Sequence, residues 1–158
     1  MPGLEDLYRE IILDHYRNPR NRGELDAPPA ARVEGFNPLC GDEVVVYLIV
    51  NSDGRVDDIK ISGQGCSISQ SSASMMSAAV KGKTVDEVRA LTRAFKAMMS
   101  IHESSLDGGE GEAVEVDPDI KLGDLEALRG VVKFPVRIKC ATLSWNTLAQ
   151  GLDEAATA

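Results

Sequence analysis

The chain has 158 residues, a formal net charge of −8 and 43% apolar residues, values typical of a soluble globular protein. A chain of this length can bury a sizeable core, so it needs no disulfide or metal merely to fold. It has no run of 18 apolar residues, and its N-terminal segment MPGLEDLYRE carries acids where a signal peptide needs an apolar run. We therefore expect a cytoplasmic protein without a membrane partner.

Residues 4–16 predict an amphipathic helix, because apolar side chains and His15 recur there at helical spacing. The NPRNRG cluster that follows ends this helix. The segment EVVVYLIV at 43–50 predicts a strand that is covered on both faces, since it is apolar and β-branched. After the NSDG turn, RVDDIKIS predicts its antiparallel partner, and residues 31–36 are expected to add a third strand.

Helices are expected in most of the remaining chain. The serine-rich segment after GQGC predicts a helix from Ser67 that ends at the capping residue Gly82. A capping box at 84–87 opens the next helix, whose buried face includes Phe95. The methionine pairs of these two helices are expected to fill the core rather than to bind a ligand.

Charge is distributed unevenly towards the C-terminus. Residues 101–128 hold nine acids against one base, whereas residues 129–140 hold four bases and no acid. The Gly- and acid-rich segment 104–124 predicts a solvated surface insertion, followed by a short helix at 124–129. Its negative charge argues against a nucleic-acid partner. A last helix is expected to start near Cys140.

This order of elements, strands first and helices afterwards, is typical of an α+β fold. The expected sheet is small and antiparallel, with about three strands, and the helices pack on one of its faces. No internal repeat interrupts the pattern. We therefore expect residues 1–158 to form a single domain that carries the acidic insertion.

The three cysteines, Cys40, Cys66 and Cys140, all lie at predicted boundaries between elements. Cys40 precedes a strand, Cys66 begins a helix, and Cys140 lies near the start of the last helix. Structural cysteines are more typical inside apolar runs. Helix starts also lower the pKa of a thiol, so these positions favour thiolates that bind a metal or attack an electrophile.

A tetrahedral metal site with three cysteines needs a fourth ligand. Asp42 stands two residues after Cys40, so both side chains could reach one ion from a single turn. Spacing alone is equally consistent with a carboxylate that only caps the turn. His15 and His102 are far from the cysteines in sequence, and we expect each to be a satisfied residue on a helix face. The cysteine spacing matches no zinc-finger pattern.

Three motifs resemble those of a known family. NPLCGD at 37–42, GQGCSISQSSAS at 63–74 and RIKCATLSW at 137–145 are similar, in order, to the three cysteine motifs of the IscU/SufU family of iron–sulfur cluster assembly proteins. The resemblance covers residues 4–153 and implies a SufE/IscU-like fold. Lys139 stands where IscU scaffolds carry a histidine, and the acidic segment resembles an insertion of the SufU-like branch.

The resemblance to the SufU-like branch implies a zinc-dependent sulfurtransferase with a tetrahedral zinc site. Its ligands would be Cys40, Asp42, Cys66 and Cys140, and the catalytic residue that accepts sulfur would be Cys40. The implied partner is a pyridoxal-phosphate cysteine desulfurase, whose histidine would replace Cys40 on zinc before persulfide sulfur is handed over. Other iron–sulfur assembly proteins would act downstream, and Arg137 is a candidate partner contact.

Two other functions stay open. Cys40, Cys66 and Cys140 could act as a scaffold that holds a [2Fe–2S] cluster and passes it on. Lys139 counts against this function, because it removes a ligand that IscU scaffolds have. The site could also be a purely structural zinc site, in which case chelation would unfold the protein.

Overall fold

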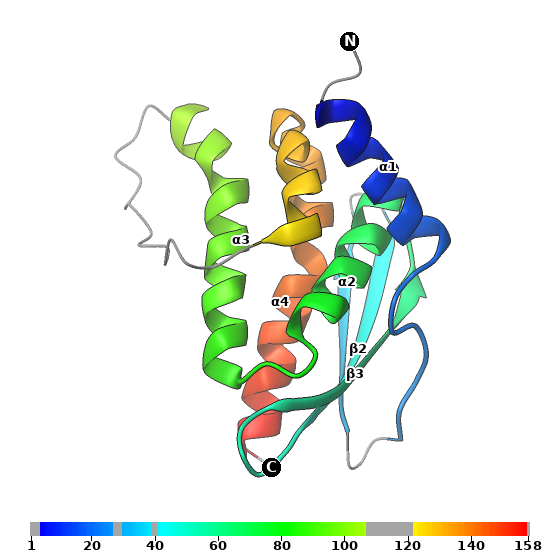
Figure 1. Cartoon of the computed structure of the whole chain (residues 1–158), viewed down its shortest axis with the longest axis vertical. Helices are drawn as coiled ribbons and strands as arrows, with labels where there is room; N and C mark the ends of the chain where they lie inside the picture. Colours follow the sequence, from blue (N-terminus) through cyan, green and yellow to red (C-terminus); the bar gives the residue numbers. More distant parts are fainter. Residues whose placement is uncertain (1–3, 27–29, 39–40, 107–121, 158) are drawn as a thin grey trace.

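The computed structural model describes residues 4–26, 30–38, 41–106 and 122–157 (Figure 1). Its elements, in chain order, are α1 (Leu4–Arg17), β1 (Ala31–Asn37), β2 (Asp42–Val50), β3 (Val56–Gln64), α2 (Ser67–Val80), α3 (Val85–Leu106), the 3-10 helix η1 (Gly123–Lys133) and α4 (Pro135–Thr157). No helix among these described residues is both long enough and apolar enough to cross a bilayer.

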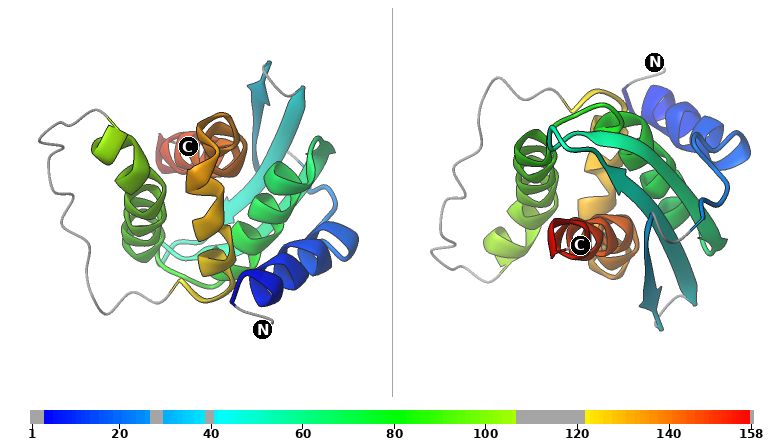
Figure 2. Two further views of the ribbon diagram at one scale, coloured as in Figure 1. Left: turned by 90° about the horizontal axis from the view of Figure 1, so that it is seen from above. Right: turned by 90° about the horizontal axis from the view of Figure 1, so that it is seen from below.

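The three strands form one antiparallel sheet in the order β1-β2-β3, which confirms the predicted α+β fold. The two end views in Figure 2 show the helices gathered on one side of this sheet. Helix α4 packs on β1 and β2, α2 packs on β3 and β2, and α1 and η1 pack on α2. The helical side of the sheet therefore holds the core.

Strand β2 is covered less evenly than its apolar sequence predicts. On the core face, Val44, Val46 and Leu48 are fully buried. On the other face, Val45 and Ile49 are only half-buried. The expectation of a strand covered on both faces is therefore only partly right. Long polar side chains shield part of the outer face, as where Arg32 lies over the Tyr47 ring, 5.8 Å from its centroid.

Helix α1 is attached to the rest of the fold by His15, whose side chain is 2% exposed. Its Nδ1 lies 2.8 Å from Ser74 Oγ of α2, and its Nε2 lies 2.9 Å from Asp124 Oδ2 of η1. The prediction of a satisfied histidine on a helix face is thus confirmed for His15. The side chain of His102 lies outside the described residues.

The predicted capping box of α3 is present. Glu87 donates its backbone N–H to Thr84 Oγ1 at 3.1 Å, and Thr84 donates its own to Glu87 Oε1 at 3.3 Å. Further along the helix Phe95 stacks on Trp145 of α4, with ring centroids 4.8 Å apart. The four methionines of the helical pairs are buried in the same core, which confirms them as core residues: Met75, Met76, Met98 and Met99.

The C-terminal boundaries differ from those predicted. The short helix expected at 124–129 is the longer 3-10 helix η1, and α4 begins at Pro135 rather than near Cys140. Proline favours the first helical position because its missing N–H would have no partner there. Of the predicted acidic insertion, residues 107–121 lie outside the described residues.

Candidate metal centre

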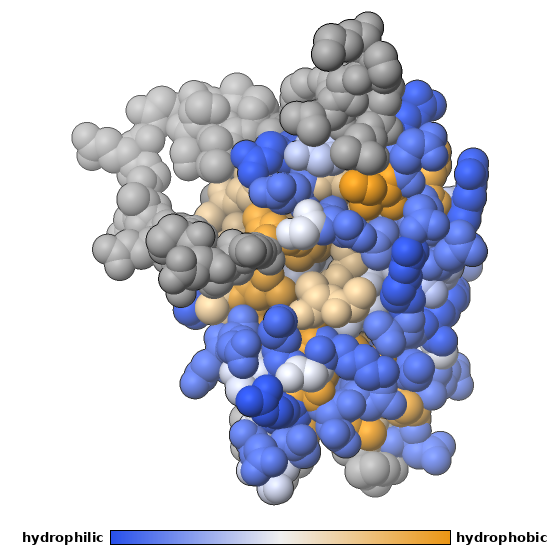
Figure 3. Space-filling model, viewed as in Figure 1, coloured by the Kyte–Doolittle hydropathy of each residue, from blue (hydrophilic) through white to orange (hydrophobic). Residues whose placement is uncertain are grey.

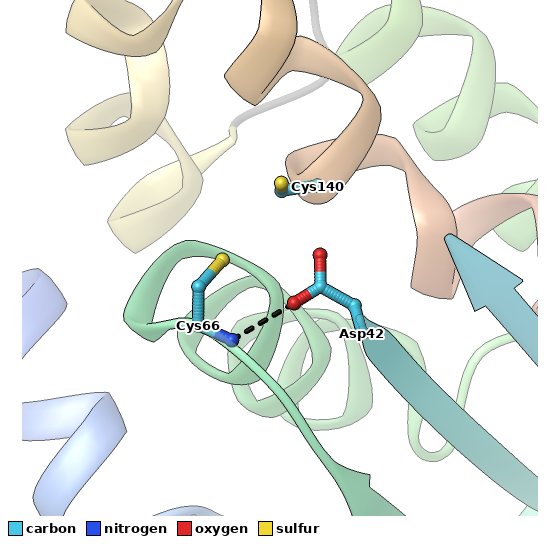
Figure 4. A group of neighbouring side chains, drawn as sticks. All are labelled: Asp42, Cys66 and Cys140. Atoms are coloured by element: carbon cyan, nitrogen blue, oxygen red, sulfur yellow. Dashed lines mark hydrogen bonds between the residues drawn. The ribbon is translucent and has the colours of Figure 1, made fainter. Parts of the chain in front are cut away.

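Three predicted site residues come together at one end of the sheet (Figure 4). Asp42 begins β2, Cys66 directly precedes α2, and Cys140 projects from α4. One ligand atom from each lies within 4.8 Å of the other two. Asp42 and Cys140 are 0% exposed, whereas Cys66 is partly exposed, and both cysteines are free thiols. A strand and two helices distant in sequence thus build one cluster.

The backbone around Asp42 and Cys66 orients their side chains toward each other. Gly41 has φ +69°, a left-handed conformation that glycine adopts without a steric penalty, immediately before β2 begins. Cys66 is the N-cap residue of α2, as predicted. Its backbone N–H donates to Asp42 Oδ1 at 2.8 Å, so the carboxylate occupies the place of a helix-capping acceptor (Figure 4).

Asp42 remains a carboxylate in spite of its burial. Desolvation by burial raises the pKa of its side chain, but hydrogen bonds from the Cys66 backbone N–H and from Cys140, Cys66 and Ser69 side chains outweigh that effect. The pKa of Asp42 therefore lies below its ordinary value, because each of these bonds favours the charged form. An ionised carboxylate is the form that binds a metal ion.

Gly65 allows the carboxylate to come this close to α2. A Cβ at this position would lie 2.5 Å from Asp42 Oδ1 and 2.7 Å from Ser69 Oγ. Ser69 is fully buried, and its hydroxyl donates to the Cys66 carbonyl at 3.1 Å. The glycine of the Gly-Cys sequence at 65–66 is therefore needed for the close packing of the site, in addition to its place in a loop.

Cys140 differs from its predicted setting. Because α4 begins at Pro135, Cys140 lies in the second turn and not at the helix start. The free N–H groups of a helix belong to its first turn, so the helix-start effect expected for this thiol does not apply at its position. The Cys140 sulfur lies instead among the buried residues of the site. One of them is Asn37, whose Nδ2 lies 3.6 Å from Cys140 Sγ. Lys139, one residue earlier, is exposed.

The donor set fits a tetrahedral zinc ion. Bonds of roughly 2.3 Å to sulfur and 2.0 Å to oxygen separate neighbouring ligand atoms by roughly 3.5–4 Å. The three ligand atoms lie within 4.8 Å of one another, which is close to these spacings. Two thiols and one carboxylate leave a fourth position for another ligand. Cys40, the predicted fourth ligand, lies outside the described residues.

A groove of about 1050 Å³ opens beside Cys66. Its walls come from α1, the start of α2, η1 and the start of α4. They are mostly apolar: Tyr8, Ile12, Leu13, Ile68, Ala127, Val131, Phe134 and Val136. Arg9 and Arg137 supply positive charge at the groove.

Two apolar residues of the groove are exposed: Phe134 is 62% exposed and Val136 is 59% exposed. Figure 3 shows hydrophobic patches within this largely hydrophilic face, one of them beside α1. The partly exposed thiol of Cys66 thus borders an open apolar surface.

The sequence predicted Asp42, Cys66 and Cys140 as site residues but not the neighbours that hydrogen-bond to them. Asn37 was predicted only as part of a motif, although the hairpin register pairs it with Asp42. Two polar residues that flank a four-residue connection between antiparallel strands are expected to face each other, and that pattern could have revealed the pair. The role of Ser69 required the packing of α2 against β2.

Fold and site together define a small α+β protein with a buried thiol–carboxylate cluster suited to a soft metal ion. Residues 7–141 match the family described as the NifU-like N-terminal domain, so the chain belongs to that family.

Several known proteins are similar over nearly the whole chain. The zinc-dependent sulfurtransferase SufU of Bacillus subtilis (strain 168) is 45% identical over 149 residues, which are 94% of this chain and 91% of that protein. The iron–sulfur cluster assembly scaffold protein IscU of Streptococcus pyogenes serotype M1 is 38% identical and covers 98% of this chain and 88% of its own length.

Two solved structures share the fold. The N-terminal part of a nitrogen-fixing NifU-like protein from Brucella abortus superposes with a TM-score of 0.77 at 27% identity and covers 98% of this chain and 97% of its own. A putative iron–sulfur cluster assembly scaffold protein for the SUF system from Fervidobacterium islandicum AW-1 gives a TM-score of 0.70 at 32% identity, over 95% and 99% of the two chains.

Proposed function

We propose that this chain is a zinc-dependent sulfurtransferase that accepts sulfur from a cysteine desulfurase for iron–sulfur cluster assembly. The observation that carries the proposal is the convergence of Asp42, Cys66 and Cys140 within 4.8 Å of one another. It is supported by the 45% identity to a relative that is named a zinc-dependent sulfurtransferase. Replacement of the IscU histidine by Lys139 also favours this function over that of a scaffold.

In this proposal Cys40, Asp42, Cys66 and Cys140 hold the zinc ion. When bound, zinc keeps coordinating thiols deprotonated at neutral pH. Asp42 suits a site that must rearrange, because a carboxylate is a harder and more easily exchanged ligand than a thiolate. Cys66 is the N-cap residue of α2 and Cys140 lies on α4, and both helices are packed into the core, which favours these cysteines as fixed anchors.

The sulfur acceptor in this proposal is Cys40. Its thiolate attacks the terminal sulfur of a persulfide on the desulfurase, R–S–SH. A new S–S bond forms on Cys40 while the old S–S bond breaks, and the desulfurase thiolate R–S⁻ leaves with the electron pair. No outside oxidant is needed, since the sulfane sulfur moves between two thiolates. Cys40 stands between Pro38 and Asp42 in sequence, on the connection between β1 and β2.

The desulfurase is proposed to dock over the groove beside Cys66. The exposed Phe134 and Val136 provide apolar contact, and Arg9 and Arg137 provide positive charge for acidic side chains of the partner. Exposed aromatic residues next to a reactive site are typical of interfaces. Arg137 keeps the role of candidate partner contact that the sequence suggested.

Metal analysis together with a desulfurase stimulation assay tests this function. We expect about one zinc per wild-type chain and a clear rise in desulfurase turnover on its addition. Cys40→Ala should abolish the stimulation, whereas Ser52→Ala, an exposed residue of the turn at the opposite end of β2, should retain it. Full stimulation by Cys40→Ala would refute the sulfur-acceptor role.

A cluster scaffold is the second candidate, favoured by the 38% identity to a named IscU scaffold protein. The same thiols could hold a [2Fe–2S] cluster, because such clusters bind to cysteine thiolates. Anaerobic reconstitution with iron and sulfide, followed by visible absorption and transfer to an acceptor apoprotein, distinguishes the two. A colourless product that transfers no cluster excludes the scaffold.

Two further parts of the proposal concern organisation and place. Residues 1–158 are proposed to form one domain with an acidic insertion at 104–124, which is supported by an apolar core cluster of the described residues that draws on both β2 and α4. A cytoplasmic location is proposed, because free thiols such as Cys66 and Cys140 stay reduced there.

A further inference from the structure

Asn37 lies opposite Asp42 at the base of the β1–β2 hairpin. The two residues are Cα partners in the antiparallel register, and residues 38–41 connect them. The Asn37 side chain is 6% exposed, so it is buried on the face of the sheet that packs against α4. A buried amide without hydrogen bonds costs free energy of folding, so the hydrogen-bond partners of Asn37 indicate its role.

The amide nitrogen of Asn37 lies between two atoms of the metal centre. Its Nδ2 donates to Asp42 Oδ2 at 3.4 Å and to Cys140 Sγ at 3.6 Å. An amide nitrogen has two hydrogens, so it can donate to both atoms at once. The reverse orientation would bring the amide oxygen against a carboxylate oxygen and a sulfur, where lone pairs would repel each other. The two acceptors therefore define which way the amide points.

The donors to the two oxygens of Asp42 are separate. Oδ1 accepts the Cys66 backbone N–H at 2.8 Å, and Oδ2 accepts the Asn37 amide. The carboxylate is thus held from two sides, once by the start of α2 and once by β1. Each oxygen has more than one acceptor direction, so these bonds still leave the carboxylate able to bind an ion.

We propose that Asn37 is a positioning residue of the metal centre. Its amide joins the Asp42 carboxylate of β2 to the Cys140 sulfur of α4 and sets the geometry in which these two ligands meet an ion. The inference rests on the proposed metal site. Partners that hydrogen-bond to metal ligands orient them and tune their bonds to the metal, and their loss typically weakens metal binding about 10- to 100-fold.

The test uses the full chain and Co²⁺ as the probe, since Co²⁺ bound to thiolates absorbs visible light. Asn37→Ala removes both donated hydrogens. Asn37→Thr introduces a β-branched residue suited to a strand and can donate only one hydrogen. Ser77→Ala is the matched control, because Ser77 is also buried and donates to the carbonyls of Arg20 and Ser74, outside the cluster.

We expect Asn37→Ala to raise the Co²⁺ dissociation constant about 10- to 100-fold and to shift the d–d bands, with Asn37→Thr between it and the wild type. Ser77→Ala should lower the stability of the metal-free protein but keep the wild-type dissociation constant and spectrum. If Asn37→Ala does not fold, Asn37→Thr decides the outcome.

An unchanged dissociation constant and spectrum in the Asn37 variants would overturn the inference, and so would equal changes in Ser77→Ala. Failure of the proposed function is distinguishable from these results. A wild-type chain that takes up neither Co²⁺ nor zinc would refute the metal centre itself, and the role of Asn37 with it. Wild-type binding with unaffected variants refutes the role of Asn37 alone.

Discussion

The backbone N–H of Cys66 donates to the carboxylate of Asp42 at 2.8 Å across 24 positions of sequence. This bond ties the first residue of β2 to the start of α2, so two predicted metal ligands meet before any ion binds. A site formed in this way binds metal with little rearrangement of its anchors, and its geometry depends on how closely the strand and the helix approach. Our first prediction concerns that close approach.

Gly65→Ala should weaken metal binding. Its Cβ would lie 2.5 Å from Asp42 Oδ1, so the carboxylate or the start of α2 must move. We expect at least a tenfold higher dissociation constant for zinc, measured by competition with a chromophoric chelator. Gly130→Ala is the matched control, because a Cβ there meets no atom within 4 Å. Equal affinities in both variants would show that the site tolerates the extra methyl group.

Zinc should stabilise the wild type in proportion to the logarithm of its free concentration. At saturation each tenfold rise adds about 1.4 kcal/mol to the free energy of unfolding, since the ion binds only the folded state. Asp42→Ala should shift the onset of this rise to at least tenfold higher free zinc, because loss of a ligand raises the dissociation constant. Glu43→Ala should leave the onset unchanged, because Glu43 is an exposed carboxylate on the adjacent position of β2. Thermal unfolding at several buffered zinc concentrations locates the onset. A wild-type onset in Asp42→Ala would mean that this carboxylate is not a ligand.

Phe134→Asp should impair docking of the desulfurase without loss of metal. Phe134 is 62% exposed at the groove beside Cys66, and a carboxylate there would oppose an acidic partner surface. We expect the concentration for half-maximal stimulation to rise on the order of tenfold, about 1.4 kcal/mol. The comparison is Phe36→Asp, since Phe36 of β1 is 60% exposed and is not among the residues that line the groove. If only the Phe36 variant is impaired, the partner docks elsewhere.

Thr84→Ala should cost about 1 kcal/mol of stability, because it removes the side-chain cap of α3. The cost should depend on pH. Hydrogen bonds from Thr84 lower the pKa of Glu87 in the folded state, so the unfolded state binds more protons and the stabilisation is complete above the ordinary pKa of a glutamate. It fades as pH falls through the lowered value.

Urea unfolding of wild type and Thr84→Ala at several pH values tests this sign. The difference between them should shrink in acid, because protonation of Glu87 weakens its bond to the Thr84 hydroxyl, and only the wild type has that bond. A difference that grows as pH falls would contradict the assignment of the box. Ser52→Ala, in an exposed turn, should show no such trend.

Much of the fold could be predicted from local pattern. Three short-range features match their predicted positions within a few residues. They are the strand–turn–strand pattern of β2 and β3 around NSDG, the capping box at Thr84 and the glycine after α2. The predicted start of α4 near Cys140 is wrong because α4 begins at Pro135, a residue that favours the first helical position. The uneven cover of β2 depended on side chains of neighbouring strands, which one strand's pattern does not include.

Residue types and motifs alone indicated which residues could form the site, because thiols and carboxylates can both coordinate zinc and three motifs contain them in order. The surroundings of Asp42 depend on the tertiary structure. Spacing alone is equally consistent with a turn residue and with a ligand. The fold brings Asp42 within 4.8 Å of Cys66 and Cys140 and lowers its pKa through hydrogen bonds that outweigh burial. These distances and bonds arise only on folding, because the donors come from distant segments that packing brings to one point.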